Sequence, residues 1–396
     1  MAAPEEHLAG ERRTGQLWLA IALGAFGTLS LALIPPVLPD LAASLDVSPG
    51  VIGWVQGAAA LPGIFFSALI GYLSDRFGRK RVALVSVVIF TVFGSAGFVA
   101  RSFELLLVFR FLQGVGTSGL LGLGLAIIGD LFSGADRTRA LGFNLVGITV
   151  TAMVAPVVAG IMAAGDPFRP FLLYLVGVPL ALWVTRLRLG SPGSTASLVP
   201  HMRSTWADMG ARGTRRDLLL IMAATVVSVS VLHGLSNTAV PLVLARDFAT
   251  GAEGRGVLVS AFQVGSALAA LIVVRRRPRQ GPGRSFTTGF IAMSAGLAMI
   301  TFAPSVLLVG VGLAAAGFGF GTITPLAQQM ATEASSPAYR GIVVLSWVTV
   351  VRFTQTVAPP SASAVTNAFE SRVAFGAMAV VTLLVAMGWR RVRRGQ

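Results

Sequence analysis

The sequence has no cysteine and few charged residues. Of its 396 residues, only 12% are Asp, Glu, Lys or Arg. Without cysteine the chain can form no disulfide, no thiolate metal site and no cysteine nucleophile. A soluble domain carries about 25% charged residues, so the low charge excludes an ordinary soluble protein. The three histidines, His7, His201 and His233, are far apart in sequence, and we therefore expect no metal, no cofactor and no enzyme activity.

What the sequence does contain is apolar. Apolar residues make up 54% of the chain and the mean hydropathy is +0.78. A bilayer core about 30 Å thick needs roughly 20 apolar residues of helix, and runs of about that length recur along the sequence. The first run is too long for a signal peptide, so we take it as a retained span. We predict an all-α integral membrane protein with twelve transmembrane helices, at residues 17–39, 51–72, 82–100, 104–128, 139–163, 168–186, 218–243, 256–274, 286–303, 305–329, 341–364 and 373–389.

The basic residues predict the orientation of these helices. The formal net charge is +15, with 31 Lys and Arg against 16 Asp and Glu. If both termini are cytoplasmic, 24 basic residues fall in inner segments and two within helices, whereas the outer loops hold five: Arg101, Arg169, Arg246, Arg255 and Arg372. Such an excess is typical of cytoplasmic loops. We therefore predict a multi-pass protein of the cell (cytoplasmic) membrane, and the short basic runs between apolar segments disfavour nucleic acid as a partner.

The longest polar stretch divides the predicted helices six and six. We expect a cytoplasmic N-terminal segment (1–16), a six-helix bundle (17–186), a cytoplasmic linker (187–217), a second six-helix bundle (218–389) and a basic tail (390–396). The halves align at a constant offset of about 203 residues, by which Gly114 matches Gly317 and Gly116 matches Gly319. This alignment indicates two pseudo-symmetric bundles related by an internal repeat.

One loop carries a specific motif. Between two apolar runs the chain reads GYLSDRFGRKRV, and the motif residues are Gly71, Asp75, Arg76, Gly78, Arg79, Lys80 and Arg81. A plain stop-transfer cluster would explain the basic residues but not Asp75 or Gly78. The spacing resembles the signature loop between helices 2 and 3 of the major facilitator superfamily. The resemblance implies transport by alternating access, with Asp75 pairing with nearby basic residues and with the inner end of helix 11.

Two further patterns resemble motifs of proton-coupled drug exporters. Helix 4 reads R-x-x-Q-G-x-G, with Arg110, Gln113, Gly114 and Gly116. This match makes Arg110 and Gln113 candidates for proton coupling, although Arg110 could instead extend to the outer surface. Helix 5 has a degenerate antiporter motif, and ordinary close packing of a membrane helix would account equally well for its residues, Gly142, Thr151, Ala155, Pro156 and Gly160.

Polar residues within the second half are candidates for the substrate site. They are Arg352 and Gln355 on helix 11, Asn237 on helix 7, and Thr322 and Thr324 on helix 10. All 16 acidic residues lie in loops or at span ends, so an unpaired Arg352 would favour anionic or neutral substrates. Alternatively, backbone carbonyls, Gln355 and water satisfy Arg352 without substrate contact. His233, whose ordinary pKa is near 6.5, and Asp40 are further proton-coupling candidates, although a lone histidine is often only a hydrogen-bonding residue.

These patterns predict a secondary transporter most similar to the twelve-helix drug:proton antiporters. We expect it to act as a monomer and to export a small organic molecule, such as a drug, an antibiotic or a natural product, in exchange for protons. Such an activity would confer multidrug resistance. The alternative is an importer or facilitator of a small anionic or neutral metabolite, because the motif loop does not set the direction of transport.

Overall fold

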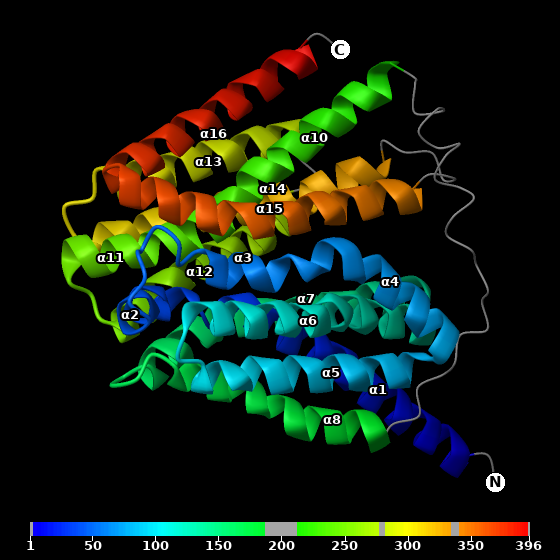
Figure 1. Cartoon of the computed structure of the whole chain (residues 1–396). Helices are drawn as coiled ribbons and strands as arrows, with labels where there is room; N and C mark the ends of the chain where they lie inside the picture. The colour runs from blue at the N-terminus through cyan, green and yellow to red at the C-terminus, as the bar shows by residue number, and fades with distance from the viewer. Residues whose placement is uncertain (1–2, 187–211, 277–281, 334–339, 395–396) are drawn as a thin grey trace. The chain divides into compact units, whose positions relative to one another are not determined.

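The computed structural model describes residues 3–186, 212–276, 282–333 and 340–394, and these residues are almost entirely helical (Figure 1). Most of the predicted linker, residues 187–211, lies outside the described residues, as do the extreme ends of the predicted terminal segments. Contacts divide the chain into two compact units. Unit 1 comprises Met1–Ile34 and Ala58–Ala196, and unit 2 comprises Pro35–Gly57 and Ser197–Gln396.

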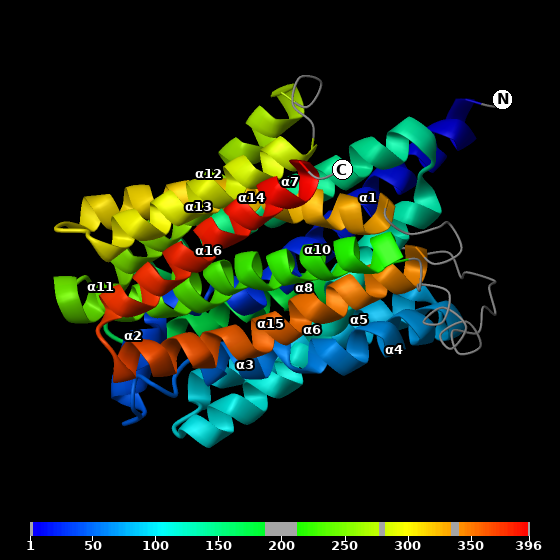
Figure 2. The same cartoon turned by 90° about the horizontal axis from the view of Figure 1, so that it is seen from above.

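Unit 1 is built around one central helix. That helix, α6 (Phe103–Leu131), contacts α1 (Ala3–Ala32), α4 (Pro62–Phe77) and α5 (Arg79–Ala96). In Figures 1 and 2, α5 lies beside α6 and α8. The remaining helical segments of this unit are part of α3 (Trp54–Ala60), η2 (Gly97–Val99), α7 (Gly134–Met162), η3 (Arg169–Val176) and α8 (Gly177–Arg186).

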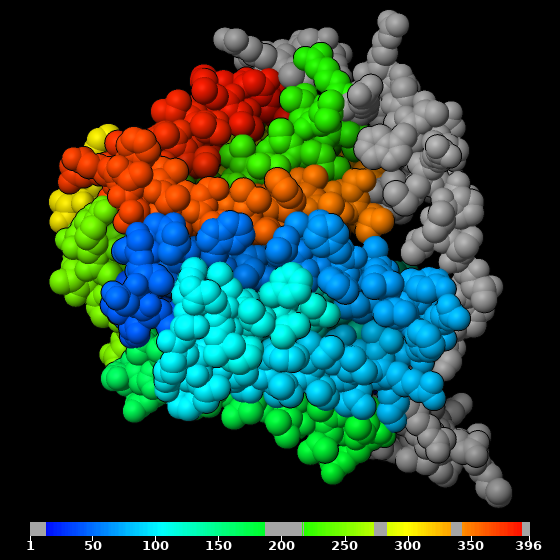
Figure 3. Space-filling view, in the orientation of Figure 1, coloured from blue at the N-terminus to red at the C-terminus, as the bar shows by residue number. Residues whose placement is uncertain are grey.

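Unit 2 repeats this arrangement around α14 (Val306–Glu333), which contacts α10 (Arg212–Ser230), α12 (Ala252–Arg276) and α13 (Pro282–Thr301). Its other helical segments are η1 (Pro35–Val37), α2 (Leu38–Ser44), the start of α3, η4 (Val231–Ala239), α11 (Val240–Phe248), α15 (Arg340–Ala368) and α16 (Ser371–Arg394). The space-filling view in Figure 3 shows α10, α15 and α16 as neighbours on one face of this unit.

The predicted spans coincide with these helices to within a few residues at most of their ends. Nine helices of the described residues are long and apolar enough to cross a membrane, from Arg13–Ser44 to Ser371–Trp389. The other three predicted spans correspond to η3 with α8, to α13 and to α15. The sixth span begins as a 3-10 helix at Arg169, and α15 contains Arg352, Pro359 and Pro360. Many large apolar side chains are exposed, among them Phe65 and Leu307, as a lipid-facing surface requires.

Two helices continue past the predicted span ends. Arg246 and Arg255, which the sequence predicts in outer loops, lie in the last turn of α11 and near the start of α12. A charged residue ends an apolar run without ending a helix, and the placement of both residues outside the membrane stays a prediction. The side chain of Arg255 is buried, and polar atoms of the protein bind it in place of water.

The internal repeat is visible in the contacts of its glycines. A Cβ added to Gly114 would lie 2.4 Å from the carbonyl oxygen of Ala59, and one added to Gly317 would lie 1.9 Å from that of Phe262. The glycines and the carbonyls they approach are thus related by the same offset in sequence. Likewise, Gly116 approaches the carbonyl of Ser86, and Gly319 approaches that of Gly289. The glycines match because each half needs close backbone approach at the same helix crossings.

This close approach makes a stability prediction for α6. Gly114→Ala should lower the free energy of unfolding by about 1–3 kcal/mol, because its methyl group would overlap a backbone carbonyl. Gly122→Ala on the same helix is the control, since nothing lies within 4 Å of the added atom. Thermal unfolding in detergent, followed by size-exclusion chromatography, measures both variants. Equal stability of the two would contradict the tight crossing.

Candidate functional site

The signature loop is a compact turn in unit 1. Helix α4 ends at Phe77, and Gly78 links it to α5 with a φ of 91°. This backbone conformation is open to glycine and strained for other residues, which explains the residue type at this point of the motif. No atom of the described residues lies within 4 Å of a Cβ added to Gly71, so packing does not require that glycine.

Arg79 is the centre of the loop's charge network. Its guanidinium lies 2.9 Å from Asp75 and 2.9 Å from Asp130 at the end of α6, and it donates a hydrogen bond to the Ser74 hydroxyl. Lys80 donates to the carbonyl of Thr185, and Arg76 donates to the Tyr72 hydroxyl. Asp75 therefore pairs with a nearby basic residue, as expected. Its pairing with the inner end of the eleventh predicted span stays a prediction, because that span corresponds to α15, which belongs to unit 2.

Arg110 is a fully enclosed charge in unit 1. Its side chain is 1% exposed and donates hydrogen bonds to Gln113, to the Tyr174 hydroxyl at 3.2 Å and to the carbonyl of Ser30. These contacts tie α6 to η3 and α1, and they show that Arg110 does not extend to the surface. The amide nitrogen of Gln113 is buried and has no hydrogen-bond partner among the described residues. The coupling role of Arg110 and Gln113 stays a prediction.

The helix-5 motif lies on α7 and is buried at its C-terminal end. Ala155, Pro156 and Gly160 are buried, and Thr151 is half-buried. Gly142 is exposed, with no atom within 4 Å of an added Cβ. The packing explanation thus fits the end of the motif that contains Pro156, while it leaves Gly142 without a packing partner in the described residues.

Asp40 takes part in an ion pair inside unit 2. The guanidinium of Arg255 binds the Asp40 carboxylate and donates to the carbonyls of Pro36 and Thr250, each at 2.7 Å. Arg255 is 2% exposed, whereas the side chain of Asp40 is 40% exposed. The pair therefore joins α2 to α12. Sequence analysis missed it because the partners are 215 residues apart.

The seventh predicted span, residues 218–243, contains a π-helical segment at the candidate residues. Between α10 and α11 the chain forms a π-helix, η4, whose nine residues from Val231 to Ala239 are all buried. A π-helical segment shifts the backbone hydrogen-bond pattern and is frequent at functional sites. His233 and Asn237, both predicted from the sequence, lie in this segment, whereas the π-helix itself was not predicted.

The structure brings three predicted residues together. Arg352 donates to the side-chain oxygen of Gln355 at 3.2 Å, and the amide nitrogen of Gln355 lies 3.1 Å from Nε2 of His233. Arg352 and Gln355 are half-buried, and His233 is 8% exposed. We call Arg352, Gln355 and His233 the 352–355–233 chain.

The hydrogen bonds of this chain determine its proton positions. Arg352 can only donate, so the amide oxygen of Gln355 faces it and the amide NH₂ faces His233. Nε2 of His233 must then accept, which places the imidazole proton on Nδ1 and favours the neutral ring. Nδ1 is buried and has no hydrogen-bond partner among the described residues. The arrangement thus offers a free N–H donor on His233 beside a guanidinium that forms no ion pair with a described carboxylate.

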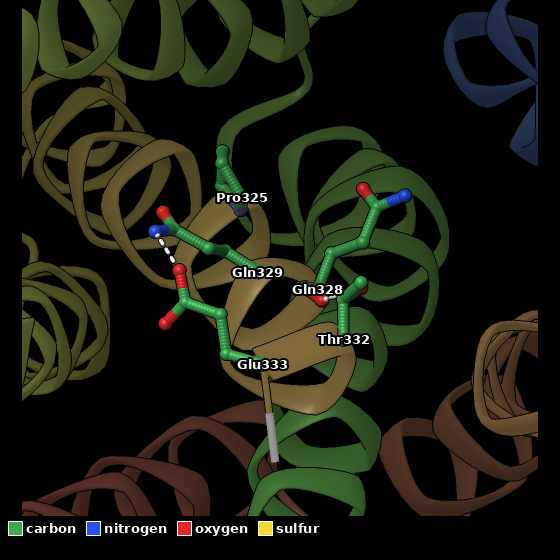
Figure 4. A pocket seen from close by; sticks show the side chains of 5 residues that line it. All are labelled: Pro325, Gln328, Gln329, Thr332 and Glu333. Carbon is green, nitrogen blue, oxygen red and sulfur yellow. Dashed lines mark hydrogen bonds between the residues drawn. The ribbon is translucent and has the colours of Figure 1, made fainter. Parts of the chain in front are cut away.

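The threonines and glutamines of α14 are less connected to this chain. Thr322 bonds back to the carbonyl of Phe318, and the Thr324 hydroxyl is buried without a partner among the described residues. A pocket of about 440 Å³ lies toward the end of α14, where Gln329 bonds to Glu333. Figure 4 shows its described lining residues, Pro325, Gln328, Gln329, Thr332 and Glu333, which all belong to α14.

Comparison with known proteins identifies the family. A sequence model described as the Major Facilitator Superfamily matches residues 19–234 and 219–396, which together cover most of the chain. The chain belongs to this superfamily. It is therefore a multi-pass membrane protein.

Curated relatives in the superfamily are distant. The Acurin A biosynthesis cluster MFS-type transporter of Aspergillus aculeatus is 27% identical over 258 residues, which are 61% of this chain and 45% of the relative. The Bacillibactin exporter of Bacillus subtilis is 28% identical over 151 residues, 36% of this chain and 38% of the relative. The chain thus spans less than half the length of these two relatives.

Solved structures confirm the fold. A point mutant of the nucleoside transporter NupG superposes with a TM-score of 0.80 at 14% identity, covering 96% of this chain and 99% of NupG. A bacterial homologue of the human lysosomal transporter Spinster superposes with a TM-score of 0.78 at 16% identity, covering 96% of this chain and 97% of the homologue. These similarities confirm the all-α MFS fold with twelve helices and say nothing about the substrate.

The loop geometry gives a prediction for transport. Asp75→Asn should lower the transport rate about 5- to 150-fold, the range of a coupling energy of roughly 1–3 kcal/mol, because Arg79 loses one of its two carboxylates. Insertion into the membrane should be unchanged. Asp136→Asn, at an exposed position near the start of α7, is the control. Transport is measured at matched expression, and a wild-type rate for Asp75→Asn would refute a switching role for this carboxylate.

Proposed function

We propose that this superfamily member exports a small organic molecule that carries a carboxylate or a similar hydrogen-bond acceptor, in exchange for protons. The observation that carries the proposal is the 352–355–233 chain, in which Arg352 and Nδ1 of His233 are neighbouring donors with no described carboxylate bound to them. A permanent positive charge and an N–H donor attract acceptors and repel cations. The substrate class is therefore anionic or neutral, in agreement with the lack of a buried acid in the predicted spans.

Export as the direction is supported by the names of relatives. One is a Bacillibactin exporter and another is the MFS-type efflux pump MMF1 of Pseudozyma antarctica, 28% identical over 221 residues. Uptake is the second candidate, because the motif loop alone does not set the direction of transport. The name of another relative, a probable 4-methylmuconolactone transporter of Cupriavidus pinatubonensis that is 28% identical over 150 residues, gives no direction. The predicted location in the cytoplasmic membrane, with both termini inside, rests on the distribution of basic residues.

Accumulation of labelled compounds tests the function and its direction. Cells with and without the protein are loaded with a panel of carboxylates, neutral acceptors and permanent cations, with and without a protonophore. The proposal expects lower accumulation of a carboxylate in cells that contain the protein, and loss of this difference with the protonophore. Higher accumulation would favour uptake, and robust transport of a permanent cation would refute the substrate class.

Substitution of Arg352 tests the proposed contact with the substrate. Arg352→Gln should abolish binding of the transported carboxylate, because no positive charge remains. Arg352→Lys should weaken binding by about tenfold, since the ammonium keeps the charge but loses the planar donor group that orients a carboxylate. Arg372→Gln, at an exposed position of α16, is the matched control. Binding to purified protein measures all three, and wild-type affinity in Arg352→Gln would exclude substrate contact.

His233 gives a further prediction from substituted variants. An asparagine amide can place a donor near the position of Nδ1, whereas a glutamine amide reaches the position of Nε2. If the neutral ring donates through Nδ1–H, His233→Asn should bind the substrate within a few-fold of wild type, and His233→Gln should bind it about tenfold more weakly. Neither should change the pH profile of transport.

The same pair of variants tests the alternative role of His233. Titration of the ring as the proton carrier stays a prediction from the sequence, and it requires the opposite result. In that case both variants would abolish the pH dependence of transport while binding at fixed pH stayed the same. That outcome would overturn the role of His233 as a neutral donor.

A further inference from the structure

Within unit 2, residues 50–57 contact η4 and α15. We call residues 35–57, which belong to this unit, the 35–57 segment. Ser363 of α15 donates to the carbonyl of Gly50 at 2.8 Å and accepts from the amide of Gly53 at 3.3 Å. A Cβ on Gly53 would lie 2.3 Å from the carbonyl of Pro359, and one on Gly57 would lie 2.6 Å from that of Thr356. Two glycines thus allow the backbones to touch.

Gln56 lies in the middle of this contact and is fully buried. Its amide nitrogen donates to the carbonyl of Asn237 at 2.8 Å and to the hydroxyl of Thr238 at 3.2 Å. Because a carbonyl can only accept, the NH₂ group of Gln56 must face the π-helix. Its side-chain oxygen is buried without a partner among the described residues, so the contacts with η4 fix the side chain.

A continuous series of hydrogen bonds leads from Gln56 to the 352–355–233 chain. Thr238 accepts from Gln56 and donates to the backbone carbonyl of His233 at 2.8 Å. The two carbonyls involved, those of Asn237 and His233, both belong to the π-helical segment. π-Helices are rare and mostly single turns, and this nine-residue segment has hydrogen bonds from outside its backbone pattern. Gln56 and Thr238 supply such bonds.

We propose that Gln56 is a positioning residue: while the 35–57 segment is bound to unit 2, Gln56 holds the π-helical segment in register and thereby aims the His233 ring at Gln355. Loss of the Gln56 contacts would allow η4 to relax toward an α-helix, which rotates the residues before Asn237, including His233, relative to those after it. Nε2 of His233 would then lose Gln355, and its proton would no longer be confined to Nδ1. The consequence for substrate binding rests on the proposed function, whereas the effect on the histidine ring does not.

The histidine ring itself provides a readout that needs no substrate. With His7→Gln and His201→Gln, the only imidazole left is that of His233. Nitrogen-15 NMR of the full-length chain, labelled at histidine, then reports which ring nitrogen carries the proton. The unmodified site should give one tautomer, with the proton on Nδ1. A ring without this pattern would refute the site geometry and, with it, the basis of the proposed function.

Gln56→Met is the decisive variant, because methionine keeps the length and approximate volume of glutamine but cannot donate. We expect the single-tautomer pattern to be lost, and the apparent KM of any transported carboxylate to rise about tenfold. Thr238→Val removes the hydroxyl that links Gln56 to the carbonyl of His233, and we expect the same effect. The double variant should be no worse than either single one, since both remove the same path.

Two controls separate positioning from general loss of structure. Gln328→Met makes the same chemical change at an exposed position of α14, and Thr382→Val does so at a buried threonine of α16. Both should keep the tautomer pattern. If Gln56→Met does not fold, Thr238→Val alone carries the test. A folded variant at either position that retains the single-tautomer pattern would overturn the proposal, even if Arg352→Gln had confirmed the substrate site.

Discussion

A guanidinium inside a membrane must be surrounded by oxygen atoms, and this requirement organises both units. Arg110 meets it through Gln113, Tyr174 and a carbonyl of α1, so three helices of unit 1 are joined at one charge. Arg255 meets it through two carbonyls and Asp40. Arg352 has a hydrogen bond to Gln355, on its own helix. The first two arginines each join helices through several oxygen atoms, whereas Arg352 has only the bond to Gln355 among the described residues. That difference distinguishes a candidate ligand site from a structural support.

Much of the fold could be predicted because it is encoded locally. Each span is an apolar run, so its position follows from the cost of exposing backbone groups to lipid. The repeat could also be predicted, because Gly114 and Gly317 each allow a helix to approach a backbone carbonyl closely at the same place in each half. The few residues by which α11 and α12 extend past the predicted spans at Arg246 and Arg255 could not, since hydropathy does not reveal whether a charge lies in water or is bound by protein oxygens.

The candidate site was predictable in its members and not in its connections. Arg352, Gln355 and His233 are conspicuous as polar residues within apolar runs. Gln56 gave no such signal, because it lies near the start of a span, where a polar residue is ordinary. Its importance comes from contacts with residues 181 and 182 positions away. The π-helix was equally inaccessible, since the bonds that support it come from side chains whose partners depend on tertiary packing.

The membership of the 35–57 segment in unit 2 breaks the symmetry of the duplicated halves. By the repeat offset, its counterpart in the second half falls near residues 238–260, in α11 and the beginning of α12, and stays with its own unit. Unit 2 therefore contains a segment from the first half of the repeat, whereas unit 1 contains none from the second half. The two halves of the sequence repeat are thus not equivalent in the fold, because the contacts of unit 2 are made by residues from both of them.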